Sequence, residues 1–117
     1  MAAREHTVHF IDPLELNLPL LDRMYKEIKN PQRVKGPSEQ NQKCRGIFGH
    51  DSITNHSTSA AMKNTLDYFL EEYFFKPLAI VSYSAEGFGG VNAAQYLRLI
   101  FAELEASSIS YSFAYTE

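Results

Sequence analysis

The sequence has 117 residues, of which 44% are hydrophobic and 13% aromatic, so it is long enough for one domain with a packed core and too short for two. The formal net charge is −3 and Lys and Arg form no cluster, which excludes the basic surface that binds nucleic acid or an anionic membrane. Cys44 is the only cysteine, and no apolar run reaches the ~18 residues of a membrane span, so neither an intrachain disulfide nor a transmembrane helix is expected. The N-terminal residues lack the apolar segment of a secretory signal, and we therefore expect a cytoplasmic protein.

The first half of the chain predicts little regular structure. Residues 7–11 (TVHFI) predict a short strand, which the following Asp-Pro ends because proline cannot donate to a sheet. Residues 24–29 predict a short helix that stops before the next proline. Residues 31–46 contain two prolines, two glycines and almost no apolar side chain, and they predict a loop. Residues 47–48 are followed by glycine and predict only a very short strand.

The stretch from residue 57 onward predicts an amphipathic helix over residues 57–73. Its apolar side chains recur at helical spacing, and one of the hydroxyl residues at 57–59 can cap its first backbone N–H groups. The apolar face comprises Met62, Leu66, Phe69, Leu70 and Tyr73.

The rest of the chain alternates strand, helix and strand. Residues 78–83 are almost all apolar, as in a parallel strand that is covered on both faces. Residues 91–106 predict a second helix, and residues 109–115 alternate apolar with small polar side chains, which predicts a final strand. This alternation indicates an α/β fold with a parallel sheet and helices on both faces.

Two turns lead from expected strands into expected helices. In open α/β sheets ligands bind beyond the carboxyl ends of the strands, where residues 54–59 and 82–90 are expected. Gly87, Gly89 and Gly90 would let the backbone approach a planar ring or a phosphate. The spacing matches neither the dinucleotide-binding fingerprint nor a Walker loop. On residue types alone, the glycine turn is either a simple connection or a ligand loop.

Two longer stretches resemble one protein family. Residues 55–106 carry N-H-S before a helix that reads A-x-K-N-x-L-D-Y, and then K-P-x-A-I-V-S-Y-S before the glycine turn. They resemble the NADPH-dependent FMN reductases, which are flavodoxin-like proteins. Residues 6–22 (HTVHFIDPLELNLPLLD) resemble the second strand and following loop of this family. The resemblance implies hydride transfer from NAD(P)H to FMN, and onward to a quinone-like or other small-molecule electron acceptor.

The resemblance also implies which residues contact the cofactor. Asn55, His56 and Ser57 are expected along the isoalloxazine ring, and a facing loop is expected on the other side of it. That loop comprises Tyr83, Ser84, Gly87, Phe88, Gly89 and Gly90. The flavin carries out the chemistry, so no catalytic acid, nucleophile or metal from the protein is expected. The family is usually dimeric, and the aromatic residues of the predicted helix 57–73 favour this helix as the interface of a homodimer.

The chain also departs from the family pattern. The family begins with a strand that ends in a G-S-x-R phosphate loop, and nothing in residues 1–117 resembles it. The family's third strand ends in P-E-Y-N, whereas residues 46–55 read GIFGHDSITN, in which we expect His50 and Asp51 to form a solvated loop pair. Residues 1–117 are therefore expected to form a single, partial and truncated flavodoxin-like domain. Loss of about three charge-assisted hydrogen bonds would weaken FMN binding by ~5–9 kcal/mol.

Two hypotheses follow. The chain is either an NAD(P)H-dependent FMN oxidoreductase or a non-catalytic remnant that pairs with full-length relatives and does not bind FMN tightly.

Overall fold

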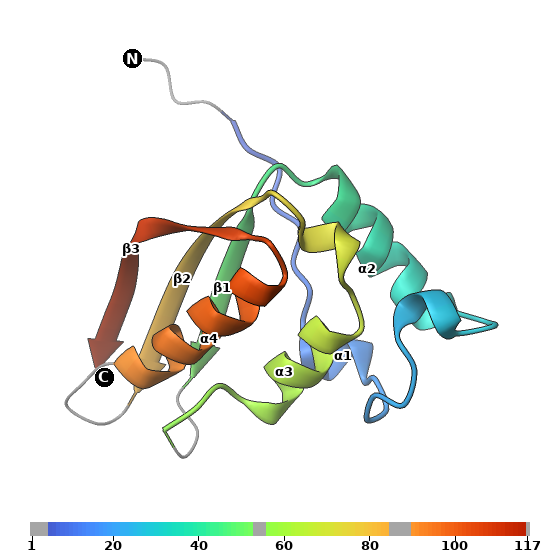
Figure 1. The fold of residues 1–117 in the computed structure, drawn as a ribbon, viewed down its shortest axis with the longest axis horizontal. Coiled ribbons are helices and arrows are strands. Elements are labelled where there is room, and N and C mark those ends of the chain that lie inside the picture. The colour runs from blue at the N-terminus through green and yellow to red at the C-terminus, as the bar shows by residue number, and fades with distance from the viewer. Residues whose placement is uncertain (1–4, 53–55, 85–89, 117) are drawn as a thin grey trace.

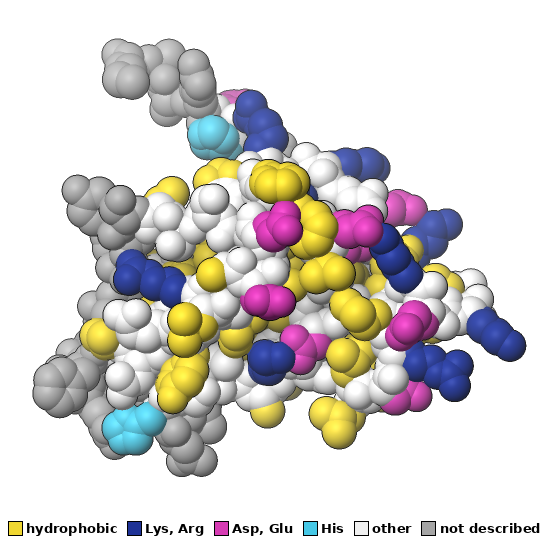
Figure 2. All heavy atoms as spheres, viewed as in Figure 1, with side chains coloured by type: hydrophobic (Ala, Val, Ile, Leu, Met, Phe, Trp, Pro, Cys, Tyr) yellow, Lys and Arg dark blue, Asp and Glu magenta, His cyan; other side chains and the backbone are white. Residues whose placement is uncertain are grey.

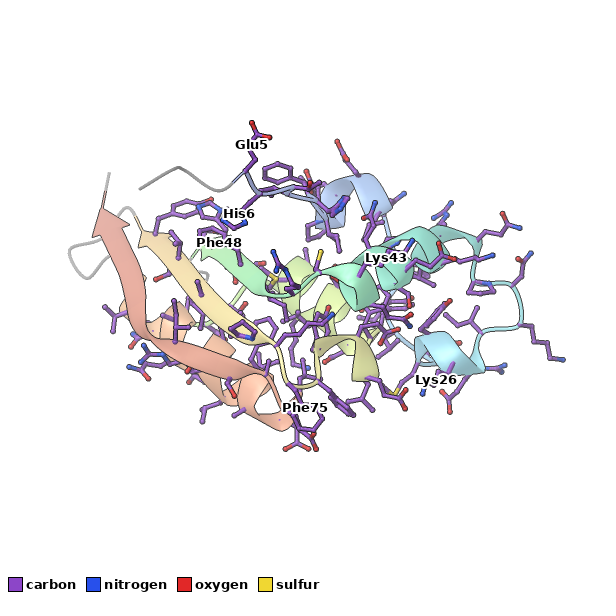
Figure 3. The ribbon with its side chains drawn as sticks, turned by 90° about the horizontal axis from the view of Figure 1, so that it is seen from above. Glu5, His6, Lys26, Lys43, Phe48 and Phe75 are labelled. Atoms are coloured by element: carbon purple, nitrogen blue, oxygen red, sulfur yellow. The ribbon has the colours of Figure 1, made fainter. Side chains whose placement is uncertain are left out.

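The computed structural model describes residues 5–52, 56–84 and 90–116, with only the backbone described at residue 84 and from residue 110 onward. The described chain contains a three-stranded parallel sheet in the order β1-β2-β3. Its strands are β1 (Ile47–Ser52), β2 (Pro77–Ser84) and β3 (Ser107–Thr116). Helix α4 crosses one face of this sheet, and the N-terminal segment lies on the other side (Figures 1 and 3). The predicted α/β fold with a parallel sheet is confirmed.

The core lies between β2 and α4 (Val91–Glu103), the helix predicted over residues 91–106. Leu78 and Ile80 of β2 are fully buried, as are Leu97 and Phe101 of α4. The spacing of four between Leu97 and Phe101 places both on the helix face that meets the sheet. The rings of Phe101 and Tyr73 pack edge to face with centroids 5.8 Å apart.

Helix α3 (Ala60–Asp67) begins three residues later than predicted and ends six residues earlier. Ser59 is the N-cap, and its hydroxyl accepts a hydrogen bond of 3.2 Å from the Met62 amide. The prediction of a helix to residue 73 is wrong, because the Leu70 amide donates to the carboxylate of Glu72 at 3.0 Å. The chain continues in the short 3₁₀ helix η2 (Glu71–Tyr73).

The prediction of a loop over residues 31–46 is wrong, because helix α2 (Gln32–Lys43) occupies most of this stretch. The helix buries Val34 and Ser38, which lie one turn apart on the same face. The Ser38 hydroxyl donates a hydrogen bond of 2.6 Å to the buried carboxylate of Glu72, and Lys76 Nζ donates to the carbonyl oxygen of Asn41. These contacts with distant residues hold the helix together despite the proline within it.

Residues 7–11 were expected to form a strand and are irregular instead. A strand requires a neighbour that takes its hydrogen bonds, and these residues join none of the three strands. Val8 and Phe10 are accordingly exposed, at 66% and 90%. The segment then enters the short helix α1 (Pro13–Leu16), which Asp12 caps by accepting from the Leu14 amide.

Two further elements of the first half differ in length from the prediction. The short helix expected at residues 24–29 is the 3₁₀ helix η1 (Tyr25–Glu27). Strand β1 is longer than expected, because all six of its residues pair in parallel with β2, from Ile47 opposite Leu78 to Ser52 opposite Tyr83. Within the described ranges, no helix is long and apolar enough to cross a membrane.

Candidate flavin site at the carboxyl edge of the sheet

The carboxyl ends of β1 and β2 meet at one edge of the sheet, because the strands are parallel and Ser52 lies opposite Tyr83. Turn 56–59 and the N-terminus of α4, which is capped by Gly90, both lie at this edge. Nδ1 of His56 lies 3.1 Å from Nδ2 of Asn92, in the first turn of α4. The described part of the structure therefore brings turn 56–59 against the N-terminus of α4, at the edge where the sequence places the ligand-binding residues.

Gly90 fixes the approach of α4 to the end of β2. It is the N-cap of the helix and has φ of 77°, in the left-handed region that favours glycine. A Cβ atom at this position would lie 2.9 Å from both the Cβ of Ser82 and the backbone nitrogen of Tyr83. Glycine thus allows the helix N-terminus, with its partial positive charge, to lie directly against the strand end.

Asp51 is a residue of this edge that the sequence reading missed. It was expected in a solvated loop with His50, and this expectation is wrong, because it lies in β1 and is only 6% exposed. Its carboxylate accepts hydrogen bonds from the hydroxyl of Thr58 and, at 2.9 Å, from the amide of Ser59. An Asp followed within eight residues by a Ser-Thr-Ser run and a helix is the sequence signal that could have indicated this contact.

The predicted residue Tyr83 has its ring on the opposite face of the sheet. The buried Ser82 lies on the α4 face of the sheet, because its side chain is next to Gly90 at the start of α4. Side chains alternate along a strand, so the side chain of Tyr83 lies on the other face. The Tyr83 ring is stacked on the imidazole of His50, with centroids 5.1 Å apart and an interplanar angle of 24°. Tyr83 and His56 therefore do not lie on the same face of the sheet edge.

The remaining predicted residues are placed as follows. Ser57 is half-buried in turn 56–59, next to His56, which is exposed and has φ of 61°. Ser84 is described as backbone only and pairs with Thr116 of β3. Four predicted residues lie outside the described ranges: Asn55, Gly87, Phe88 and Gly89.

Two polar side chains described at this edge can hydrogen-bond a planar ligand. The imidazole of His56 and the carboxamide of Asn92 are polar groups that can bond the edge of a planar ring. No Lys or Arg occurs in residues 46–62 or 77–97. A phosphate at this edge would therefore be bound by hydroxyl and backbone N–H groups, without a cationic side chain from either turn.

Two hollows in the described residues lie away from this edge. One, of about 280 Å³, is lined mainly by apolar residues from segments 18–19 and 28–34, together with Tyr68. The other, of about 420 Å³, lies between residues 5–9 and residues 43–46; Figure 3 shows Glu5 and His6 on the side of the sheet where Phe48 is labelled. Neither hollow contains a predicted site residue.

The charged side chains show no cationic region over the face seen in Figure 2, where Lys and Arg alternate with Asp and Glu. Among residues 5–52, 56–84 and 90–116, no three His, Cys, Asp or Glu side chains lie close enough together to hold a metal ion. The polar groups described at this edge are hydroxyl, amide and imidazole groups and the carboxylate of Asp51.

Comparison with known proteins identifies the family. A search of curated proteins finds no match to the chain. The family model described as NADPH-dependent FMN reductase matches residues 1–117, which is the whole chain. The parallel α/β sheet with helices, and the two turns at its carboxyl edge, agree with this match. The chain therefore belongs to the NADPH-dependent FMN reductase family.

Proposed function

We propose that the chain binds FMN at the carboxyl edge of β1 and β2 and acts as an NAD(P)H-dependent flavin oxidoreductase with a quinone-like or other small-molecule acceptor. Membership of the family supports NAD(P)H-dependent flavin reduction in general. The observation that supports this location is the contact of 3.1 Å between His56 and Asn92, which joins turn 56–59 to the first turn of α4. Bound FMN supplies the hydride chemistry, and the chain binds and orients it.

The contact between His56 and Asn92 also determines what His56 offers to a ligand. With Nδ2 of Asn92 donating, Nδ1 of His56 accepts, and the proton of the neutral imidazole is then on Nε2. Nε2 is therefore a donor for a ligand carbonyl oxygen or ring nitrogen. Ser57 adds a hydroxyl beside it, and Gly90 places the N-terminus of α4 next to the same turn.

The alternative is that the chain is a non-catalytic member that pairs with full-length relatives and does not bind FMN tightly. Three observations support this alternative. Residues 7–11 form no strand, and Phe48 on the edge strand β1 is 65% exposed. In addition, neither turn supplies a cationic side chain for the phosphate.

The homodimer expected through residues 57–73 stays a proposal. Three aromatic side chains that favoured this interface, those of Tyr68, Phe69 and Tyr73, are buried in the core of the chain itself. A dimer of this kind would use the exposed face of α3, which includes Ala60, Ala61 and Lys63.

Titration of the chain with FMN, followed by quenching of flavin fluorescence, tests the proposed function. We expect binding at micromolar FMN, steady-state oxidation of NADPH, and weaker binding by the His56→Ala variant. His9→Ala is the matched control, because His9 is exposed and lines a hollow away from this edge. A chain that leaves FMN unquenched at high micromolar concentration would refute the proposal and favour the alternative.

A further inference from the structure

Asp51 is the most deeply buried carboxylate at the proposed flavin site and has no role in the chemistry described so far. It belongs to β1 and pairs with Ser82 of β2, which is fully buried. Asp51 lies on the same face of the sheet as Gly49, two residues earlier. This is the α4 face, because a Cβ atom added to Gly49 would lie 3.8 Å from the ring of Phe101. The position of the Asp51 carboxylate is therefore fixed by the core.

The carboxylate connects this fixed strand to turn 56–59. The Thr58 hydroxyl and the Ser59 amide both donate to its Oδ2 atom. Ser59 in turn caps α3 through its own hydroxyl, so strand, turn and helix form one chain of hydrogen bonds. Hydrogen bonds to a buried charged group are stronger than those between neutral groups, because water does not compete for them.

His56 depends on this anchor. It precedes Thr58 by two residues and has a φ of 61°, in the left-handed region. Residues other than glycine adopt this backbone conformation at a cost in free energy. Its contact with Asn92 is made at an exposed position, where water competes for the same atoms. The anchored residues Thr58 and Ser59 limit where His56 can move, and so keep it opposite Asn92.

We propose that Asp51 is a positioning residue of the site, whose carboxylate holds turn 56–59 on the end of β1 so that His56 faces Asn92. The effect on FMN rests on the proposed function. The effect on the turn is a property of the ligand-free chain and is measured without FMN.

The first experiment is amide hydrogen exchange of the ligand-free chain and its Asp51→Asn and Thr58→Val variants. We expect the amides of turn 56–59 to exchange about 10- to 100-fold faster in both variants, because a charge-assisted bond to the turn is lost. Asp67→Asn is the control, since it removes the carboxylate at the end of α3, which forms an exposed ion pair with Lys63. Unchanged exchange in the turn of both variants would overturn the proposal. Thr58→Val keeps the test valid where Asp51→Asn does not fold.

The second experiment is FMN titration of the same variants, with the visible circular dichroism of the bound flavin as a spectroscopic readout. We expect the Kd to rise about 10-fold in Asp51→Asn and by less in Thr58→Val, which keeps the bond from the Ser59 amide. The double variant should bind no more weakly than Asp51→Asn, because the bond between Thr58 and Asp51 is already lost there. Asp67→Asn should match the wild type. Wild-type affinity and spectrum in Asp51→Asn, despite a faster-exchanging turn, would overturn the positioning role. If the wild type itself fails to bind FMN, the proposed function is refuted, and the exchange experiment alone decides whether Asp51 positions the turn.

Discussion

Replacing Gly90 with alanine tests the packing of α4 against the sheet. The added Cβ would lie 2.9 Å from the Cβ of Ser82, 2.9 Å from the backbone nitrogen of Tyr83 and 3.1 Å from the carbonyl carbon of Ser82. Two of these atoms belong to the backbone of the central strand β2, which is paired on both sides and cannot move aside. The helix N-terminus must therefore shift away from the strand end.

Two terms contribute to the expected loss of stability. Alanine in a left-handed conformation costs about 1–2 kcal/mol relative to glycine, and Gly90 has φ of 77°. Insertion of a methyl group into a closely packed contact costs about 1–3 kcal/mol more. We expect the free energy of unfolding to fall by about 3 kcal/mol, which lowers the Tm by about 10 °C for a domain of this size.

The assay is thermal and urea unfolding followed by circular dichroism, with Gly36→Ala as the matched control. Gly36 lies inside α2, and apart from its chain neighbours and the backbone of the helix itself, no described atom lies within 4 Å of a Cβ added to it. The same substitution there removes only the flexibility of glycine, so we expect the stability to rise by about 0.5–1 kcal/mol. The two variants thus differ in sign although the chemical change is identical.

A Gly90→Ala variant with the Tm of the wild type would refute this reasoning. It would mean that α4 does not start against Ser82 and Tyr83 as described. The FMN titration gives a second readout, because a displaced α4 also moves Asn92 away from His56, and weaker binding is expected.

Two further predictions concern Glu72 and Tyr73, the buried residues of η2. Glu72→Ala leaves the Ser38 hydroxyl and the Leu70 amide without their carboxylate acceptor, so we expect a loss of about 2–4 kcal/mol in urea unfolding and faster tryptic cleavage of α2. Glu71→Ala, which breaks an exposed ion pair, should change the stability by less than about 0.5 kcal/mol, and equal effects of the two variants would contradict the prediction. Burial, together with the nearby Glu72 charge, raises the pKa of Tyr73 above its ordinary value of 10.0. Above pH 10 the unfolded chain therefore loses a proton that the folded chain keeps, and stability falls as pH rises. Between about pH 8 and about pH 11, the urea midpoint of the Tyr73→Phe variant should fall less than that of the wild type. The exposed Tyr96→Phe is the control and should behave as the wild type does. An equal fall of the urea midpoint in all three proteins would refute the prediction.

The second half of the chain could be predicted from the sequence, because its side chains follow a helical or a strand period. Leu97 and Phe101 recur at helical spacing, and the apolar run at Leu78 and Ile80 indicates a covered strand. These residues are buried where the period places them. The turn at Gly90 was likewise expected, since glycine is the residue that accommodates its backbone conformation.

The candidate site was predicted only in part. His56 and Gly90 lie at the expected edge, but no pattern of residues indicated that Tyr83 turns to the other face and stacks on His50. Asp51 was missed because its burial depends on strand β1 being six residues long, whereas the glycine within it predicted a very short strand. Asn92 was missed because its role depends on a contact between residues 36 positions apart.

The sequence by itself determined the family, the α/β class and the elements from residue 77 onward, since these depend on local periodicity and on motifs of adjacent residues. Only the tertiary structure decided that residues 32–43 are helical and that residues 7–11 are not a strand. Helix α2 contains Pro37 and few apolar residues, and it is stabilised by contacts with Glu72 and Lys76, more than 30 positions away. Residues 7–11 have the composition of a strand but no neighbouring strand. The physical reason is the same in both cases. Each segment becomes regular only if residues distant in the sequence supply the contacts that stabilise it.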